Sequence, residues 1–209
     1  MIEKGWVAVN GFVAIPGDRA LPDAEITLSA EAHAQLDDTL TLIMNKPRGF
    51  TSAADEFGGA PAMTLLTAQN FFTTASGALD EQHAPRLPGS GLRVAGRLST
   101  REMGLVVFTT ETALARRLAA ADVLETWRVD FREAPPVDAT EIISSALHNA
   151  VQLANDPDNA NALLLITPSL AKGILSSICD GQSWRTDLTR IQRGEVVLGD
   201  VPSGRWCVR

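Results

Sequence analysis

The sequence predicts an α+β protein in which a mixed, mostly antiparallel sheet carries several flanking helices, and three observations support this. Strand-length apolar segments recur along the chain, such as "TLTLIM", "TWRVDF" and "NALLLIT". Between them lie segments with apolar residues at helical spacing, such as "TETALARRL". Near the N-terminus, the Asn-Gly pair of "WVAVNGFVAI" is typical of the tight turn of an antiparallel hairpin.

Residues 1–36 form the first predicted unit. The hairpin around Asn10 and Gly11 is followed by a loop and a short strand in "PGDRALPDAEITL", and then by a short helix or linker in "EAHAQLDD". A unit of this size cannot bury a substantial core by itself. We therefore predict a small N-terminal unit at 1–36, followed by a larger domain at 37–209.

The first half of the larger domain is expected to begin with the strand "TLTLIM", which ends at the proline- and glycine-containing turn "NKPRGF". A short helix in "APAMTLLTAQNFF" and a flexible loop in "TTASGALDEQHAPRLPGSG" are expected to follow. Two strands are predicted in "LRVAG" and "GLVVFTT". The next segment, "TETALARRLAAAD", predicts a helix with Thr110 as its N-cap.

The second half is expected to contain further strands and helices. A strand is predicted by the alternation in "TWRVDF", and an amphipathic helix by "PPVDATEIISSALHNAVQLAN". A buried strand in "NALLLIT" precedes a helix in "PSLAKGILSSICDG", with Pro168 near the start of that helix and Gly181 after its end. Three short strands in "LTRIQRG", "EVVLG" and "GRWCVR" close the domain.

Composition excludes several classes of protein. The 209 residues are 45% hydrophobic and 21% charged, which is ordinary for a globular protein. No apolar run approaches the ~18 residues of a membrane span, and the first residues show neither a secretory signal nor a transit-peptide pattern. We expect a cytoplasmic protein without a membrane partner, with an organelle or the nucleus left open. Cys179 and Cys207 are expected to be free buried thiols, and no metal site or cofactor is implied.

Charge is unevenly distributed along the chain. The net charge of −7 argues against a general nucleic-acid binder, because phosphate binding needs clustered cations. Between Arg86 and Arg132, however, eight arginines stand against five acidic residues. Two interpretations stay open. These arginines either form salt bridges within an acidic protein or contact RNA, and we favour RNA.

Five segments in this order resemble the RNA pseudouridine synthases of the RsuA type, which modify uridines in ribosomal RNA. They are "GWVAVNGFVAIPGDRALPDAEITL", "LIMNKPRGFTSAADEFGGAPAMTLL", "VAGRLSTREMGLVVFTTETALARRL", "ETWRVDF" and "LTRIQRGEVVLGDVPSGRWCVR". The first resembles the second half of an S-four-like RNA-binding domain, without the two helices that usually lead it. The resemblance therefore implies a truncated S-four-like unit at 1–36 and the pseudouridine synthase fold at 37–209.

The resemblance is weakest where the chemistry of the family is carried out. Ser99 stands where the family has its nucleophilic aspartate, Trp127 where it has a tyrosine, and Glu125 where it has a basic residue. A serine hydroxyl needs a neighbouring base to become a nucleophile, and an indole N–H cannot act as a general base. The resemblance thus implies a degenerate member with no retained catalytic residue, a pseudoenzyme.

Ser99 and the acidic residues near it in the sequence allow other interpretations. An active synthase that uses another acid would need Asp55, Glu102 or Asp122 to replace the missing aspartate. Ser99 also forms a Ser-x-x-Glu pattern with Glu102, which is a local capping signal and is favoured over a hydrolase serine, since no Gly-x-Ser-x-Gly motif is present.

RNA contact is the function that the sequence favours. We expect an inactive synthase-like factor that associates with RNA or a ribonucleoprotein, such as the ribosome or an assembly particle. A protein-interaction module, with a partner chain completing the N-terminal unit, is a further alternative. Arg97, without the aspartate of the family, is expected to pair with Glu102, Asp55 or a phosphate. The residues expected to bind RNA are Lys46, Arg48, Arg93, Arg97, Arg101, Arg116, Arg117 and Trp127.

Overall fold

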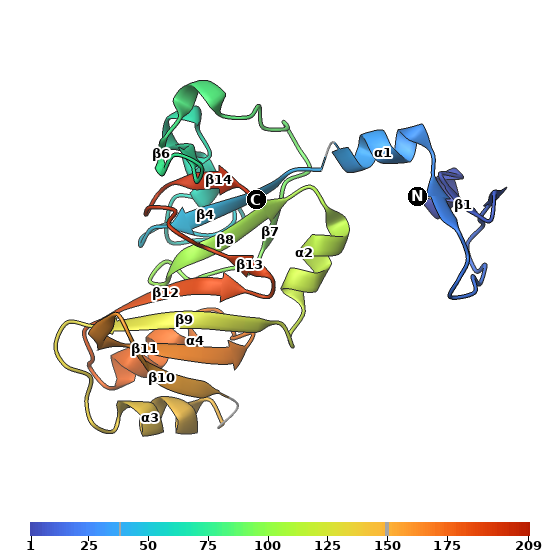
Figure 1. Cartoon of the computed structure of the whole chain (residues 1–209). Coiled ribbons are helices and arrows are strands. Elements are labelled where there is room, and N and C mark those ends of the chain that lie inside the picture. Colours follow the sequence, from blue (N-terminus) through green and yellow to red (C-terminus); the bar gives the residue numbers. More distant parts are fainter. Residues whose placement is uncertain (38, 149–150) are drawn as a thin grey trace. The chain divides into compact units, whose positions relative to one another are not determined.

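The computed structural model describes residues 1–37, 39–148 and 151–209. The chain divides into two compact units, Met1–Leu40 and Thr41–Arg209 (Figure 1). Within the described residues, no helix has the length and apolar character needed to cross a membrane.

The small unit is a three-stranded antiparallel sheet with β1 (Val7–Val9) between β2 (Phe12–Val13) and β3 (Ile26–Leu28). The predicted hairpin is confirmed. Val9 pairs with Phe12, and the two turn residues have φ angles of 49° and 83°, as this tight turn requires. A 3-10 helix, Ile2–Lys4, precedes the sheet, and α1 (Ala30–Asp37) follows it.

The large unit is built on one mixed sheet, in which β10, β11, β9, β12, β8, β4 and β14 lie in this order (Figure 1). Only the β12–β8 pair is parallel among the described strands, so the predicted mixed, mostly antiparallel sheet is confirmed. Two short strands, β7 and β13, add to β8 and β12. The strands are β4 (Thr41–Lys46), β7 (Arg93–Ala95), β8 (Met103–Thr109), β9 (Leu124–Phe131), β10 (Gln152–Asp156), β11 (Asn159–Pro168), β12 (Thr186–Arg193), β13 (Val196–Val197) and β14 (Trp206–Val208).

Helices of eight residues accompany this sheet: α2 (Thr112–Ala119), α3 (Ala139–Ala146) and α4 (Ile174–Gly181). Helix α2 buries Leu114 and Leu118 in the same core cluster as Leu105 and Val107 of β8. Apolar burial of this kind drives folding, and it anchors β8, the strand that follows the 96–102 segment.

Five predicted elements differ from the structure. The "APAMTLLTAQNFF" segment forms two 3-10 helices, Ala62–Leu65 and Ala68–Asn70, because Thr67 is extended and separates them. A small hairpin follows, in which β5 (Phe72–Thr73) begins at the end of the predicted helix segment and β6 (Ala78–Leu79) lies in the expected loop. A further 3-10 helix, Glu81–His83, also lies in that loop.

The other three differences concern helix ends. Helix α3 ends at Ala146, and β10 begins within the rest of its predicted span, of which residues 149–150 lie outside the described residues. Pro168 ends β11, and α4 begins only after Gly173, whose φ of 83° suits glycine. The N-cap of α2 is Glu111, one residue after the expected Thr110.

Candidate functional site

Three loop segments meet around Ser99. The segment after β4 is joined to the segment before β8 by a hydrogen bond from the Gly49 amide to the Thr100 carbonyl, 2.7 Å long. The buried Ser52 hydroxyl strengthens this junction, since it accepts from the Leu98 amide at 2.8 Å and donates to the Leu98 carbonyl at 3.1 Å. The third segment, before α4, is held by the Gly173 amide, which donates to Glu102 Oε1 at 3.1 Å.

Ser99 and Glu102 form the reciprocal bonds that the Ser-x-x-Glu pattern predicts. The Ser99 amide donates to Glu102 Oε2 at 2.8 Å, and the Glu102 amide donates to Ser99 Oγ at 3.3 Å. A strand follows this motif, and not a helix, because β8 begins at the next residue. Glu102 is 2% exposed, and its carboxylate is occupied by the backbone amides of two segments.

Among the residues that the structure describes, no base is placed to activate the Ser99 hydroxyl. Within the described parts of the chain, Oγ only accepts a hydrogen bond, and no carboxylate or imidazole accepts one from it. The Glu102 carboxylate contacts the amide of Ser99 and not its hydroxyl. This geometry stabilises the loop and provides no activated nucleophile.

Arg97 pairs with two carboxylates of the segment after β4. Its guanidinium lies 3.2 Å from Asp55 Oδ2 and 3.5 Å from Glu56 Oε1. The expectation that Arg97 pairs with Asp55 is confirmed, whereas Glu102 points elsewhere. Glu56 was not anticipated from the sequence. Its carboxylate is 6% exposed and also binds Lys172 at 3.3 Å and the Ser52 amide at 3.0 Å.

A buried ion cluster lies behind this loop, formed by Glu125, Arg190 and Arg193. Glu125 Oε1 lies 2.9 Å from Arg190 Nη1 and also accepts from Arg193. Its other oxygen accepts from the Trp127 indole at 2.8 Å. All three charged side chains are 4% exposed or less. Burial lowers the pKa of Arg190 to about 9 and that of Arg193 to about 10, while the charge of Glu102 raises the pKa of Arg190.

The ion cluster supports the turn that leads to Ser99. Arg190 donates to the carbonyls of Gly96 and Leu105, the latter at 2.7 Å from Nη2. Gly96 has a φ of 73°, and a Cβ there would lie 2.5 Å from Arg193 Cδ. The two arginines therefore pack directly beneath the turn.

The sequence contained part of the signal for this cluster. The alternation in "ETWRVDF" already places Glu125 and Trp127 on one face of β9, and both are buried there. Arg190 and Arg193, three residues apart, would point to opposite faces of a regular strand. A bulge between Arg190 and Gln192 brings them to the same face, and no sequence pattern predicted this bulge.

Two residues expected to bind RNA are buried in the structure, so this part of the prediction is wrong. Trp127 is 2% exposed, and its ring packs against Arg190, whose Cζ lies 5.6 Å from the ring centre. Lys46 is fully buried, and its Nζ donates to the carbonyls of Phe50 at 2.8 Å and Pro47 at 3.1 Å. Neither side chain offers a surface to a phosphate or a base.

Burial lowers the pKa of Lys46 from 10.5 to about 8, although Glu102 and Glu56 raise it. Between these two values the unfolded chain binds more protons than the folded one, so the free energy of unfolding rises with pH. Below pH 8 the full cost of the buried charge applies. Between pH 8 and 10.5 we expect the free energy of unfolding of the wild type to rise by up to about 3 kcal/mol relative to that of Lys46→Met. Urea denaturation at each pH measures this difference.

The pH dependence of this difference is the informative quantity, because loss of two hydrogen bonds in Lys46→Met gives a constant offset. Lys4→Met removes an exposed ammonium and serves as the control. If the free energies of unfolding of the wild type and Lys46→Met change in parallel with pH above pH 8, the lowered pKa of Lys46 is contradicted.

The other arginines expected to bind RNA fall into two groups. Arg48 and Arg101 flank the Ser99 loop and pair with Asp187 at 2.7 Å and Asp180 at 2.6 Å. The second group lies at α2: Arg93 donates to Thr112 Oγ1 at 2.9 Å, Arg117 pairs with Glu195 at 2.7 Å, and Arg116 is exposed. The salt-bridge interpretation is thus confirmed for Arg48, Arg97, Arg101 and Arg117. Such exposed pairs are weak, so they remain available to another anion.

The two cysteines are free and buried, as expected, and burial raises the pKa of both thiols. In the part of the chain that the structure describes, no three His, Cys, Asp or Glu side chains gather in a way that could hold a metal ion.

Comparison with known proteins gives a relative and a fold. No family model matches the chain. The chain is 28% identical over 165 residues to a ribosomal large subunit pseudouridine synthase B from Pasteurella multocida (strain Pm70), and the match covers 76% of this chain and 42% of that protein. The chain therefore spans less than half the length of this relative. A crystal structure of a pseudouridylate synthase superposes with a TM-score of 0.54 at 17% identity, over 100% of this chain and 86% of the other.

Proposed function

Since this chain is related in sequence to the RsuA-type pseudouridine synthases and has their fold, we propose that it associates with RNA or a ribonucleoprotein and no longer isomerises uridine. The single observation that carries the proposal is the state of Ser99. Ser99 replaces the carboxylate that the resemblance implies. Its hydroxyl accepts a hydrogen bond from the Glu102 amide, and no base lies beside it among the described residues. The name of the relative makes ribosomal RNA the natural partner, on the ribosome or on an assembly particle.

An active synthase with a different acid is the alternative, and the contacts of the nearby carboxylates argue against it. Asp55 is paired with Arg97, Glu56 with Arg97 and Lys172, and Glu102 with backbone amides. Asp122 lies in an exposed turn between α2 and β9. A carboxylate already held by such partners would have to be displaced to attack the sugar, and misplacement by ~1 Å can cost ~100-fold in rate.

We expect purified protein to form no pseudouridine in ribosomal RNA above the level without protein, as measured by mass analysis of nucleosides. Ser99→Ala provides the control, because it leaves every carboxylate in place. Pseudouridine formation by both the wild type and Ser99→Ala would overturn the proposal and favour an enzyme with another acid.

RNA binding is expected to weaken in Arg97→Glu, by about tenfold at 50 mM salt. The change removes one cation and places a third acid beside Asp55 and Glu56. Fluorescence anisotropy with a labelled ribosomal RNA fragment measures the affinity. Arg86→Glu makes the same charge change at an exposed loop position outside the proposed surface. Equal affinities of the two variants would count against Arg97 as a contact.

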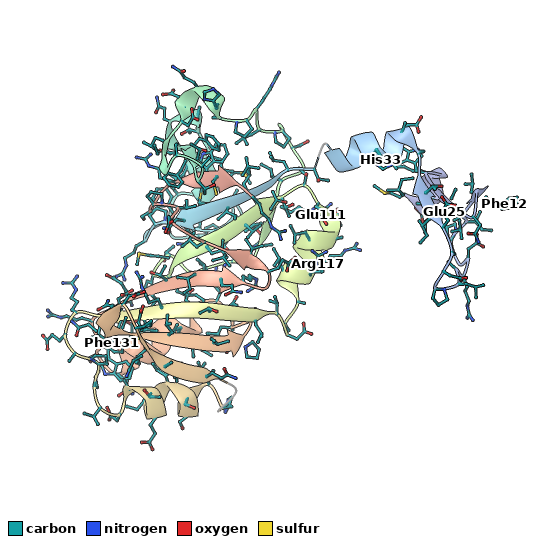
Figure 2. All side chains as sticks on the ribbon, in the orientation of Figure 1. Phe12, Glu25, His33, Glu111, Arg117 and Phe131 are labelled. Carbon is teal, nitrogen blue, oxygen red and sulfur yellow. The ribbon has the colours of Figure 1, made fainter. Side chains whose placement is uncertain are left out.

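A protein-interaction role has one specific observation in its favour, on the small unit. Val9 pairs with both Phe12 and Ile26, so the three side chains share one face of the sheet. Phe12 is 81% exposed and Ile26 62% exposed, and Figure 2 shows Phe12 at the edge of the unit. Exposed apolar faces of this kind often mark interaction sites. Capture of a protein partner that is lost in Phe12→Ser, with RNA binding unchanged, would establish this second function.

A further inference from the structure

A cavity lined by four arginines opens beside the Ser99 loop. It has a volume of about 300 Å³, and Arg48, Arg101, Arg132 and Arg185 line it together with Asp180 and Asp187. We call these residues the arginine pocket. The net charge of this pocket is positive, although the whole chain carries −7. Positively charged side chains are therefore clustered here in an otherwise acidic protein.

The four guanidinium groups differ in their partners. Those of Arg48 and Arg101 are paired with Asp187 and Asp180. Those of Arg132 and Arg185 have no carboxylate partner among the described residues, and a backbone hydrogen bond of 3.1 Å from Arg132 to Arg185 holds their main chains together. The pocket thus contains two uncompensated guanidinium groups, the side chain best suited to bidentate phosphate binding.

Trp184 extends the arginine pocket with an aromatic surface. Its half-buried ring lines this cavity and also a neighbouring one of about 250 Å³, which shares Arg132 and Arg185. The ring of Phe131, at the end of β9 in Figure 2, supports it edge-on with centroids 5.6 Å apart and planes at 61°. The structure leaves part of the Trp184 ring accessible.

We propose that the arginine pocket binds a phosphate of single-stranded RNA and that Trp184 stacks on an adjacent base. Phosphate-binding cations next to an aromatic platform are the combination by which proteins hold unpaired nucleotides. The Gly49–Thr100 hydrogen bond links the loops that carry Arg48 and Arg101, which connects the pocket to the Ser99 loop. This inference rests on the proposed RNA binding and names the part of the surface that performs it.

Asp180 and Asp187 regulate the affinity of this pocket. Each neutralises an arginine in the free protein, and each repels an entering phosphate. Asp187→Asn releases Arg48 from its pair and removes one negative charge. It is therefore expected to raise the affinity for RNA several-fold at low salt, opposite to the effect of the arginine variants.

The test measures anisotropy of a labelled single-stranded RNA oligonucleotide between 50 and 200 mM salt. The double variant Arg132→Gln/Arg185→Gln should bind about tenfold more weakly at 50 mM salt and lower the log–log salt slope by about 0.7, the value for one phosphate contact. Trp184→Leu should bind about 5- to 150-fold more weakly with an unchanged slope. Arg86→Gln is the matched control, and thermal melting confirms that each variant is folded.

The possible results separate the arginine pocket from the proposed RNA binding of the chain as a whole. Wild-type affinity and slope in both the arginine and the Trp184 variants would overturn the pocket while leaving RNA binding intact. Absence of RNA binding by the wild type at 50 mM salt would instead overturn the proposed function. Calorimetry with inorganic phosphate and a nucleoside monophosphate separates the sources of phosphate. Binding of these alone, abolished by the double arginine variant, would assign the pocket to a small phosphorylated molecule and overturn the RNA assignment.

Discussion

Replacing Glu125 by Gln is expected to lower the free energy of unfolding by about 3–5 kcal/mol, as the loss of one partner of a buried ion pair does. Arg190 and Arg193 are both buried, and Glu125 is the carboxylate that contacts both of them. Without it, two guanidinium groups stay in the interior and lose the carboxylate that contacts both of them among the described residues. Glutamine has nearly the same shape as glutamate. The loss of free energy of unfolding therefore reports the removed charge and not a change in packing.

The two arginines cannot leave the interior to regain water. Arg190 is tied to the carbonyls of Gly96 and Leu105, and Arg193 donates to the Leu118 carbonyl. Urea denaturation of Glu125→Gln should therefore show a lower midpoint with an unchanged slope. Glu133→Gln makes the same change at an exposed position and should leave the midpoint within about 0.5 kcal/mol of wild type. Equal midpoints for the two variants would show that the cluster carries no net charge stabilisation.

Gly104→Ala is expected to destabilise the protein by more than about 3 kcal/mol, or to prevent folding. Gly104 pairs with Arg190 in the parallel contact between β8 and β12, at the centre of the sheet. Its φ is 97°, and a Cβ would lie 2.3 Å from the Arg190 carbonyl oxygen and 2.8 Å from the Arg190 amide nitrogen. Both obstacles are backbone atoms, so the added methyl group can be accommodated only if the two strands separate.

Gly181→Ala is the matched control for this effect. Gly181 is the last residue of α4, its φ is not positive, and nothing lies within 4 Å of an added Cβ. Alanine costs less than glycine in a helix, so this variant should be neutral or slightly more stable. Thermal melting compares the two. A melting temperature of Gly104→Ala equal to that of Gly181→Ala would contradict the close β8–β12 contact.

Local pattern predicted much of this fold and little of the geometry around Ser99. The turn at Asn10 and Gly11 depends only on adjacent residues, and the Ser99–Glu102 bonds span three residues, so both followed from the sequence. The burial of Lys46 and the accessible ring of Trp184 did not, because each depends on which segments pack over it. Lys46 was expected to bind RNA, but it is buried, because charge alone does not keep a side chain at the surface.

The sequence by itself determined the class of fold, the hairpin and the replacement of a carboxylate by Ser99, because residue identity and strand alternation are local. Only the tertiary structure decided that Glu125 would meet Arg190, 65 residues away, and that Arg190 would support Gly96, 94 residues away. The bulge in β12 that turns Arg193 to the same face arises from strand pairing. The arginine pocket likewise combines side chains from separate segments, and such juxtaposition follows from packing and not from spacing along the chain.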